Sequence, residues 1–304
     1  MHGYFGPAGT FTHQALLSIT DAEAKPYSSV VGALAGVRSG EVEAAVVPIE
    51  NSVEGGVSAT LDELINGSPL MIRREILVPV SFGLYARPGT TLADVRHVLT
   101  HGHAAAQCRR FLSELSDATV TEAGSTAGAA KEVARDDSRH DAAVCARVAG
   151  QLYGLSELAW QIEDNPGAVT RFVEVCQAGD APERTGADKT TLVAFMDEDR
   201  SGALLEILEQ FKVRGVNLTR IESRPTKTSL GSYCFSIDAE GHVADQRVAE
   251  TLEGLARICP RLYFLGSYPR ADERAPKLDD RFSDESFTAV SYTHLRAHET
   301  PEHL

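Results

Sequence analysis

Strand-like and helix-like segments alternate through the first 175 or so residues of this 304-residue chain, which restricts the folds open to it. Apolar runs such as Ala44–Val47 are typical of strands, and segments such as Ser58–Ile65 have helical spacing. This order is typical of sheets with parallel strands covered by helices. We therefore predict two α/β lobes, about 1–77 with 155–178 and about 78–154, joined by strands that cross near Val78–Val80 around a cleft. Further helices are expected over Leu92–Leu99, Ala104–Leu115 and Ser125–Ala134.

A breaker-rich stretch, Ala178–Asp188, separates this part from a second domain over residues 189–270. Its segments follow the order β-α-β-β-α-β, a ferredoxin-like α+β arrangement. The expected elements are strand Thr190–Met196, helix Ala203–Val213, strands Asn217–Arg224 and Ser232–Asp238, helix Ala244–Ile258 and strand Leu262–Gly266.

The periodic pattern stops after Pro269. Residues 271–304 are charged and rich in breakers, which predicts a disordered tail. Residues 290–304 change character abruptly and hold three of the ten histidines. We interpret this last stretch as translated cloning or adaptor sequence and exclude it from any site.

Composition excludes several classes of partner. The net charge of −14 disfavours nucleic acid and anionic membranes, and no apolar run approaches the ~20 residues of a membrane span. There is no secretory signal pattern at the N-terminus, and the five cysteines are scattered without a C-x-x-C pair. We therefore expect a cytoplasmic protein with reduced thiols, without a nucleic-acid or membrane partner.

The segment from Gly6 to Thr12 combines glycines and hydroxyls between a strand and a helix. A helix start presents free N–H groups to an anion, so Thr10 and Thr12 are candidate anion donors. The alternative is an ordinary turn in which one of these threonines caps the helix. The spacing matches neither G-x-G-x-x-G nor the P-loop, which disfavours nucleotide binding.

Polar residues follow the strand Ala44–Val47 at the point where it should end. Because ligands bind at the carboxyl ends of strands in open α/β sheets, Glu50, Asn51 and Ser52 are candidates to face the cleft. The alternative is a capped turn that leads into the next helix.

The run from His101 to Cys108 resembles a metal site only superficially. Two histidines at a loop-to-helix junction lack further ligands at metal spacing, so we expect no metal. Gln107 is instead expected to point its amide at a ligand. Ser125 and Thr126 open another helix and could donate to an anion, or could simply cap that helix.

Thr170, Arg171 and Phe172 open a strand after a turn-rich segment. An arginine beside a threonine can hold a carboxylate through two N–H groups while the hydroxyl donates to another oxygen. The alternative is an arginine on a solvated edge. Motifs of nucleophilic or metalloprotease catalysis are absent from the sequence.

The order of these segments is more specific than any one of them. G-P-x-G-T-F-T, V-P-I-E-N-S-x-x-G, the H…Q-C helix, S-T-A-x-A-A, Y-G-L and T-R-F together resemble the prephenate dehydratase family. The following G-A-L and E-S-R-P resemble an ACT domain, and the resemblance spans about Gly3 to Pro269. It departs from the family pattern at Ala168, where members often carry Asn, and at His101-Gly102-His103, where H-P-Q is common.

The resemblance implies a catalytic domain over residues 1–178 with two lobes like a type II periplasmic binding protein, followed by an ACT regulatory domain. It implies conversion of prephenate to phenylpyruvate with loss of water and carbon dioxide, and feedback by phenylalanine. It looks like the monofunctional form, because a helical chorismate mutase region is not seen before Gly3. No cofactor or metal is expected, and ACT domains usually pair, so we expect a homodimer or homotetramer.

The family pattern also assigns roles. Thr170 would donate to the leaving hydroxyl, Arg171 would bind a carboxylate, and Glu50 would complete the catalytic set. The substrate-binding residues would be Thr10, Thr12, Asn51, Ser52, Gln107, Ser125, Thr126 and Phe172. The phenylalanine site would comprise Gly202, Ala203, Leu204, Asn217, Leu218, Glu222, Ser223, Arg224 and Pro225.

Three alternatives stay open. The enzyme could act on arogenate in place of prephenate. Two lobes around a cleft also describe a non-catalytic solute-binding protein, although Thr170 and Arg171 argue against that class. An amino-acid-sensing module that acts through a partner protein is the third alternative.

Overall fold

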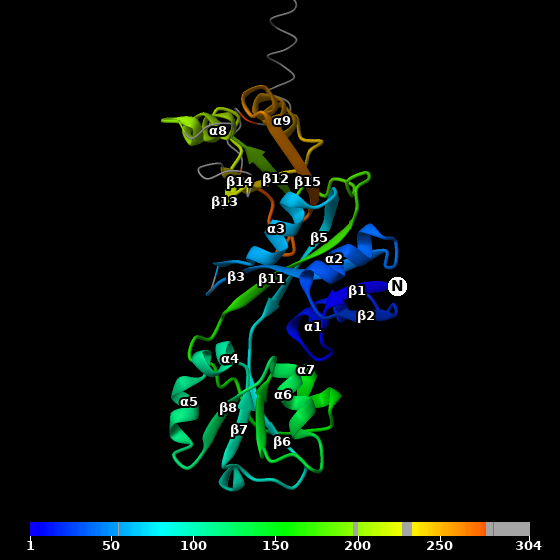
Figure 1. Ribbon diagram of the computed structural model, residues 1–304. Helices are drawn as coiled ribbons and strands as arrows, with labels where there is room; N and C mark the ends of the chain where they lie inside the picture. Colours follow the sequence, from blue (N-terminus) through cyan, green and yellow to red (C-terminus); the bar gives the residue numbers. More distant parts are fainter. Residues whose placement is uncertain (54, 197–199, 227–232, 278–281, 283–304) are drawn as a thin grey trace, which may run out of the picture. The chain divides into compact units, whose positions relative to one another are not determined.

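The computed structural model describes residues 1–53, 55–196, 200–226, 233–277 and 282 (Figure 1). These residues form two compact units. The first comprises Met1–Glu63 and Ile76–Cys176, and the second comprises Leu64–Glu75 and the described residues from Gln177 onward. Most of the expected tail, including residues 290–304, lies outside the described residues.

Two sheets lie mainly in the first unit, and the first of them includes β5, which continues into the second unit. The first sheet has the order β2-β1-β3-β11-β5, with the short β4 beside β3. β1 runs parallel to both β2 and β3, whereas β11 is antiparallel to β3. The strands of this sheet are β1 His2–Phe5, β2 Ala24–Tyr27, β3 Ala44–Asn51, β4 Gly55–Gly56, β5 Leu70–Pro79 and β11 Val169–Gln177. Its helices are α1 Phe11–Leu17, α2 Val30–Arg38 and α3 Ser58–Asn66.

The second sheet has the order β10-β6-β9-β7-β8. Its strands are β6 Gly83–Ala86, β7 His97–Thr100, β8 Thr119–Glu122, β9 Ala142–Cys145 and β10 Ser156–Trp160. β10 pairs with β6, so it belongs to this sheet and not, as expected for residues from 155 onward, to the first lobe. The chain crosses between the sheets where the Val80 N–H donates to the Ala168 carbonyl (2.7 Å), close to the expected crossing.

Two expected helices of this part differ in the structure. Leu92–Leu99 becomes a short 3₁₀ turn and then strand β7, because pairing with β8 and β9 overrides the local pattern. Ala104–Leu115 is divided at Cys108 into α4 Gly102–Gln107 and α5 Arg109–Glu114. The Asp164 carboxylate accepts from the N–H groups of Arg109 (3.0 Å) and Arg110 (3.1 Å) and so caps a new helix start. The remaining helices of this sheet are α6 Thr126–Val133 and α7 Arg147–Leu152.

The apolar cores of the two sheets meet at Phe11. One core packs Tyr4, Val46 and Phe172 together, and Phe11 contacts it. The Phe11 ring also meets the Phe82 ring of the second core edge to face, with centroids 5.5 Å apart. The Phe11 side chain is therefore shared by the apolar cores of the two sheets.

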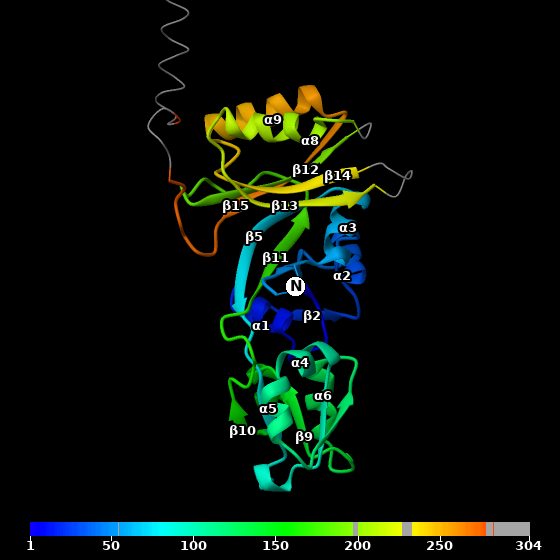
Figure 2. The ribbon, with the colours of Figure 1, turned by 90° about the vertical axis from the view of Figure 1, so that its left-hand side faces the viewer.

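The second unit has the predicted β-α-β-β-α-β order. Its sheet is antiparallel with strand order β13-β14-β12-β15, and α8 and α9 lie on one face (Figure 2). Residues such as Leu192, Ile207, Phe211 and Leu255 fill the core between helices and sheet. The elements are β12 Asp188–Phe195, α8 Ala203–Lys212, β13 Leu218–Pro225, β14 Tyr233–Glu240, α9 Gln246–Ile258 and β15 Arg261–Pro269.

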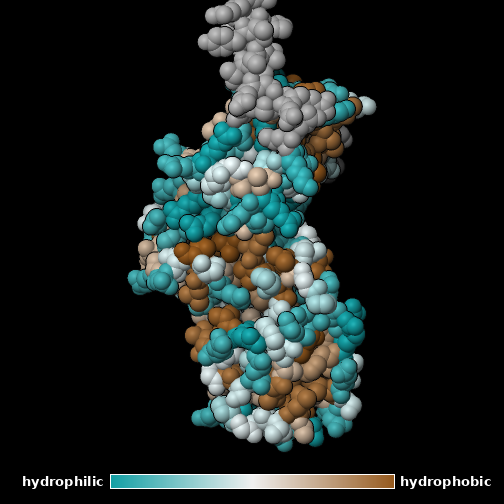
Figure 3. All heavy atoms as spheres, turned by 180° about the vertical axis from the view of Figure 1, so that it is seen from behind, coloured by the Kyte–Doolittle hydropathy of each residue, from teal (hydrophilic) through white to brown (hydrophobic). Residues whose placement is uncertain are grey.

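The surface carries both polar and apolar side chains. On the face shown in Figure 3, apolar side chains gather over the first unit between polar ones. Exposed apolar residues occur on both units, for example Leu152 at 49% and Leu205 at 59% exposure. Among the described residues, the helices are too short or too polar to span a membrane.

Candidate active site

The ends of β3 and β11 bring four candidate residues together. In the antiparallel register Asn51 lies opposite Thr170, and Glu50 lies opposite Arg171. The Asn51 Nδ2 donates a hydrogen bond to the Thr170 Oγ1 at 2.8 Å. The Arg171 Nη1 lies 3.4 Å from the Glu50 Oε2. The structure therefore joins two motifs that lie 119 positions apart in the sequence.

The Asn51 amide is oriented by a second bond. Its Oδ1 accepts from the Val53 N–H at 2.8 Å, which leaves its NH₂ group to face Thr170. Because the Thr170 oxygen accepts from that NH₂ group, its own proton is directed away from Asn51. Thr170 is 8% exposed, so this proton is presented in a largely dry environment.

Arg171 is buried, at 6% exposure, and this excludes the alternative of a solvated edge arginine. The Glu50 side chain is more open, at 37%. A buried guanidinium is stable only with acceptors around it, and Glu50 supplies one of them. A substrate carboxylate that took the position of the Glu50 carboxylate would lie within hydrogen-bonding reach of the same guanidinium.

Ser52 and Phe172 both have structural roles in this part of the sheet. The Ser52 Oγ accepts from the Val169 N–H at 2.9 Å, which extends the β3–β11 pairing. Phe172 is 2% exposed inside the core of the first sheet. A register shift between Arg171 and Phe172 accompanies this inward placement. Phe172 therefore supports β11 from within the core, and its assignment to substrate binding stays a prediction.

The loop Gly6–Thr10 leaves the same edge of the sheet as Glu50 and Asn51, because β1 and β3 are parallel. Thr10 is the N-cap of α1: its Oγ1 accepts from the His13 N–H (3.3 Å) and donates to the Pro7 carbonyl (3.0 Å). The capping alternative therefore holds for Thr10. Thr12 is 5% exposed within α1.

Two further candidate residues lie at the start of α6. Ser125 caps this helix, and its Oγ accepts from the Gly128 N–H at 2.9 Å. Thr126 follows it and is half-buried. Gly9 has φ +89°, and a Cβ there would lie 3.4 Å from the Ala127 Cβ and 3.1 Å from the Ala149 Cα. Only glycine lets the loop approach α6 and α7 this closely.

Gln107 ends α4, directly before the break at Cys108. Its backbone carbonyl accepts from the Asp164 N–H at 2.6 Å, so the turn-rich segment before Thr170 is attached to this helix. The Gln107 side chain is half-buried. The Ala168 side chain is buried in the core of the second sheet, so it adds no polar group to the site.

Two residues that contact the loop Gly6–Thr10, His13 and Tyr153, were not identified as candidates from the sequence. The His13 Nδ1 accepts from the Gly9 N–H at 3.1 Å, and its ring stacks on Tyr4 with centroids 4.8 Å apart. Burial lowers the pKa of His13, which keeps Nδ1 as an acceptor. The Tyr153 hydroxyl donates to the Ala8 carbonyl at 3.2 Å, and burial raises its pKa. A histidine four residues after a loop glycine is a local signal, whereas nothing local links Tyr153 to Ala8.

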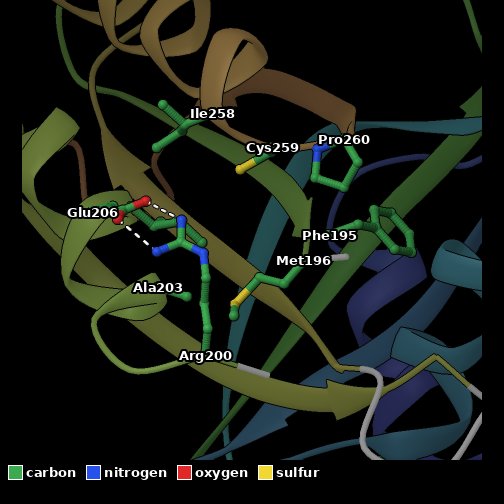
Figure 4. A pocket seen from close by; sticks show the side chains of 9 residues that line it. Phe195, Met196, Arg200, Ala203, Glu206, Ile258, Cys259 and Pro260 are labelled. Atoms are coloured by element: carbon green, nitrogen blue, oxygen red, sulfur yellow. Dashed lines mark hydrogen bonds and ion pairs between the residues drawn. The ribbon is translucent and has the colours of Figure 1, made fainter. Parts of the chain in front are cut away.

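A pocket of about 280 Å³ lies in the second unit (Figure 4). Arg200 and Glu206 form an ion pair beside it, with Nη1 2.7 Å from Oε1. Ala203 lines the pocket, Gly202 is the N-cap of α8, and Leu204 is partly exposed. Phe195, Met196, Ile207, Ile258, Cys259 and Pro260 complete the lining.

The other expected effector residues lie elsewhere in the second unit. Asn217 precedes β13, and Leu218, Glu222, Ser223, Arg224 and Pro225 lie on this strand. β13 is at the edge of the sheet, separated from β12 by β14. Within one chain, the expected effector residues therefore form two groups. One group lies at the pocket and the start of α8, and the other lies at the edge strand β13.

The His101–Cys108 segment is built as a helix start. The His101 Nδ1 accepts from the His103 N–H at 3.3 Å, and Cys108 is fully buried. Burial raises the pKa of the Cys108 thiol to about 12. Within the described part of the chain, no three His, Cys, Asp or Glu side chains are grouped to hold a metal ion.

Comparison with known proteins decides the family. The protein-family model described as prephenate dehydratase matches residues 2–180. The chain belongs to the prephenate dehydratase family. A prephenate dehydratase of Mycolicibacterium vanbaalenii is 46% identical over 88% of this chain and 91% of its own length. One from Amycolatopsis methanolica is 45% identical over 94% of this chain and 93% of its own length.

A solved structure extends this likeness over both units. The prephenate dehydratase of Arthrobacter aurescens, determined in complex with L-Phe, superposes with a TM-score of 0.92 and is 50% identical. The match covers 98% of this chain and 99% of that chain. The resemblance found in the sequence motifs, and the expectation of a lyase of this family, are confirmed.

Proposed function

We propose that this prephenate dehydratase family member converts prephenate to phenylpyruvate at the paired ends of β3 and β11. The observation that carries the proposal is the 2.8 Å bond from Asn51 to Thr170, which leaves the Thr170 proton free for a leaving group. Family membership supports prephenate as the substrate, and this geometry supports Thr170 as the hydrogen-bond donor.

The reaction needs a hydrogen-bond donor for the leaving hydroxyl and binding sites for the two carboxylates of prephenate. The bond from the ring to its carboxylate breaks and releases carbon dioxide, and its electron pair forms a new ring double bond. The adjacent ring double bond shifts in turn and expels the hydroxyl on the opposite side of the ring, which takes up a proton that the solvent supplies and leaves as water. The ring becomes aromatic without any change that needs an external oxidant or reductant, so the proposal includes no cofactor.

Thr170 donates a hydrogen bond to the departing hydroxyl in this proposal. A threonine is a poor acid, so it stabilises developing negative charge by partial proton donation. Asn51 prevents the Thr170 proton from turning toward β3. Burial of Thr170 strengthens the bond, since little water competes for it.

Arg171 binds a substrate carboxylate, with Glu50 holding the guanidinium between turnovers. Asn51 and Ser52 form one wall, and the loop with Thr10 and Thr12 leaves the sheet at the same edge. Ser125, Thr126 and Gln107 contribute from the other lobe. The carboxylate to be lost is held in the drier part of the proposed site, since desolvation favours its departure.

We further propose that the second unit is an ACT-type sensor that binds L-phenylalanine and reduces activity. The Arthrobacter aurescens relative was solved with L-Phe. The division of the candidate residues between a pocket and an edge strand favours a homodimer or homotetramer in which two copies complete each site. We place the protein in the cytoplasm.

A single assay series tests the function. Purified protein is mixed with prephenate, and phenylpyruvate absorbance is followed with and without L-phenylalanine. Turnover that L-phenylalanine suppresses is expected, and arogenate is compared under the same conditions. Binding of prephenate without turnover would favour the solute-binding alternative, and amino-acid binding without turnover would favour the sensor that acts through a partner.

A further inference from the structure

A row of buried polar side chains crosses three strands of the second unit. Arg220 on β13 lies opposite Asp238 on β14, which lies opposite Thr191 on β12. The Arg220 Nε is 2.9 Å from the Asp238 Oδ2, and the Thr191 Oγ1 donates to the Asp238 Oδ1 at 2.8 Å. Asp238 and Thr191 are completely buried. We refer to Arg220, Asp238 and Thr191 as the Arg220 row.

One end of the Arg220 row reaches the expected effector strand. The Arg220 Nη1 lies 3.3 Å from the Glu222 Oε2, and Glu222 is also paired with Arg224 at 3.5 Å. Glu222 and Arg224 belong to the E-S-R-P segment. A ligand that engages either side chain would change the charge balance around Arg220.

The other end lies close to a buried ion pair. Lys189 precedes Thr191 by two residues on β12, so the two side chains share a face. The Lys189 Nζ is 2.7 Å from the Glu75 Oε2, with side-chain exposures of 10% and 2%. The Glu75 Oε1 also accepts from the Ala271 N–H at 3.0 Å. β5 is thereby attached to the regulatory unit through both carboxylate oxygens of Glu75.

A second close approach holds the same part of β5. A Cβ on Gly266, which has φ +133°, would lie only 2.2 Å from the Ile72 carbonyl oxygen. β15 therefore contacts the backbone of β5 directly, and no side chain fits between them. This contact leaves β5 little freedom to slide without moving the regulatory sheet.

β5 is continuous from this attachment into the first unit. Glu75 is the last residue of the segment that belongs with the second unit, and Ile76 and Val78 lie in the apolar core around Phe172. In the first sheet β5 neighbours β11, and Phe172 is two residues from Thr170 on that strand. β5 therefore joins Glu75 through the backbone to the core that supports the proposed donor.

We infer that the Arg220 row and the Lys189–Glu75 pair couple effector binding on β13 to the position of β5, and through it to the strand that carries Thr170. The inference rests on the proposed regulation by L-phenylalanine. Coupling of this kind requires contiguous packed and hydrogen-bonded groups with a shared equilibrium. Tyr268 links the row to the ion pair, because its hydroxyl lies 2.6 Å from the Thr191 Oγ1 and it stands opposite Lys189 in the pairing of β12 with β15.

Adjacent threonines on β12 offer a matched test. Thr191→Val removes a hydroxyl that bonds Asp238 and the Tyr268 hydroxyl, at 2.8 and 2.6 Å. Thr190→Val removes an equally buried hydroxyl that bonds the Gly241 carbonyl and the Ser267 hydroxyl, at 2.8 and 2.7 Å. Each variant loses one buried hydroxyl and its two hydrogen bonds, but only Thr191 belongs to the Arg220 row. Glu75→Gln tests the Lys189–Glu75 pair. It keeps the size of the side chain and removes its negative charge.

The measurements are kcat/KM with and without L-phenylalanine, calorimetric binding of L-phenylalanine, and amide hydrogen exchange of residues 76–78. In the wild-type protein we expect inhibition by a factor of about 5 or more, with changed exchange on binding. Thr191→Val and Glu75→Gln should bind L-phenylalanine and keep basal activity, but show an inhibition ratio near one and unchanged exchange. Thr190→Val should behave as the wild-type protein does.

Other results would overturn either the coupling alone or the proposed regulation as well. Equal inhibition in all variants, or equal loss in Thr190→Val and Thr191→Val, would overturn the coupling while leaving the regulation intact. A wild-type protein that neither binds L-phenylalanine nor responds to it would overturn the proposed regulation and the coupling with it. The catalytic proposal would survive either result.

Discussion

The Asn51 side-chain amide donates to the Thr170 hydroxyl oxygen across β3 and β11, at 2.8 Å. The Val53 N–H holds the other end of that amide, so the direction of the bond is determined by its surroundings. The orientation of the Thr170 proton is therefore set by a residue of another strand. Five predictions follow from this and other contacts.

Thr170→Ala should lower kcat by a factor of about 10² to 10⁴ with little change in KM, because it removes a donor used mainly in the transition state. Steady-state kinetics with prephenate measures both constants. Thr170→Ser keeps a hydroxyl and should retain most of the activity. Full turnover by the alanine variant would remove Thr170 from the mechanism.

Asn51→Asp should also lower kcat strongly, because a carboxylate accepts a proton where the amide donates one. The Thr170 hydroxyl would then turn toward residue 51, away from the substrate. The Val53 N–H keeps an acceptor, so the melting temperature should change little. A variant with normal kcat would show that the orientation of Thr170 is not set by Asn51.

Phe172→Ala should destabilise the first unit by about 3–5 kcal/mol, as expected for a large buried side chain. The chain has a single tryptophan, Trp160 on β10, so its fluorescence during urea denaturation reports on this unit. Phe172→Leu should lose less stability and keep KM near the wild-type value. A large rise in KM for the leucine variant would support Phe172 as a substrate contact.

His13 should make stability fall in mild acid. Burial holds its pKa in the folded protein below the ordinary value of 6.5. Between these two values the unfolded chain binds a proton that the folded chain does not, so stability falls as pH decreases through this window. Melting temperatures between about pH 8 and pH 5 measure the effect.

The matched variant is His13→Asn, whose amide oxygen can accept from the Gly9 N–H at any of these pH values. It should show a smaller fall in melting temperature toward acid than the wild-type protein. Identical pH profiles would indicate that other groups dominate the acid response.

Glu222→Ala should relieve inhibition by L-phenylalanine without loss of catalysis, because it alters the edge strand that carries the E-S-R-P segment. Inhibition curves at fixed prephenate concentration measure the effect. Glu253→Ala is the control, since Glu253 is an exposed residue of α9 with 67% side-chain exposure. Ser223→Ala should act as Glu222→Ala does, and full inhibition of both would argue against a sensor at β13.

Much of the fold was predictable because its signals are local. Alternating apolar segments predicted an α/β part followed by β-α-β-β-α-β, and the second unit has that order. The failures occurred where tertiary contacts override the local pattern. Leu92–Leu99 pairs as β7, and the Asp164 carboxylate divides the helix expected over Ala104–Leu115.

The sequence by itself determined the family and the kinds of side chain at each strand end, since these depend on residue identity and order. Only the tertiary structure decided how they act. Antiparallel pairing of β3 with β11 turned Asn51 toward Thr170, while Phe172 entered the core and Thr10 became a helix cap. The physical reason is that a hydrogen bond or a buried contact depends on register and packing between segments far apart in the chain, and neither is written in the local pattern.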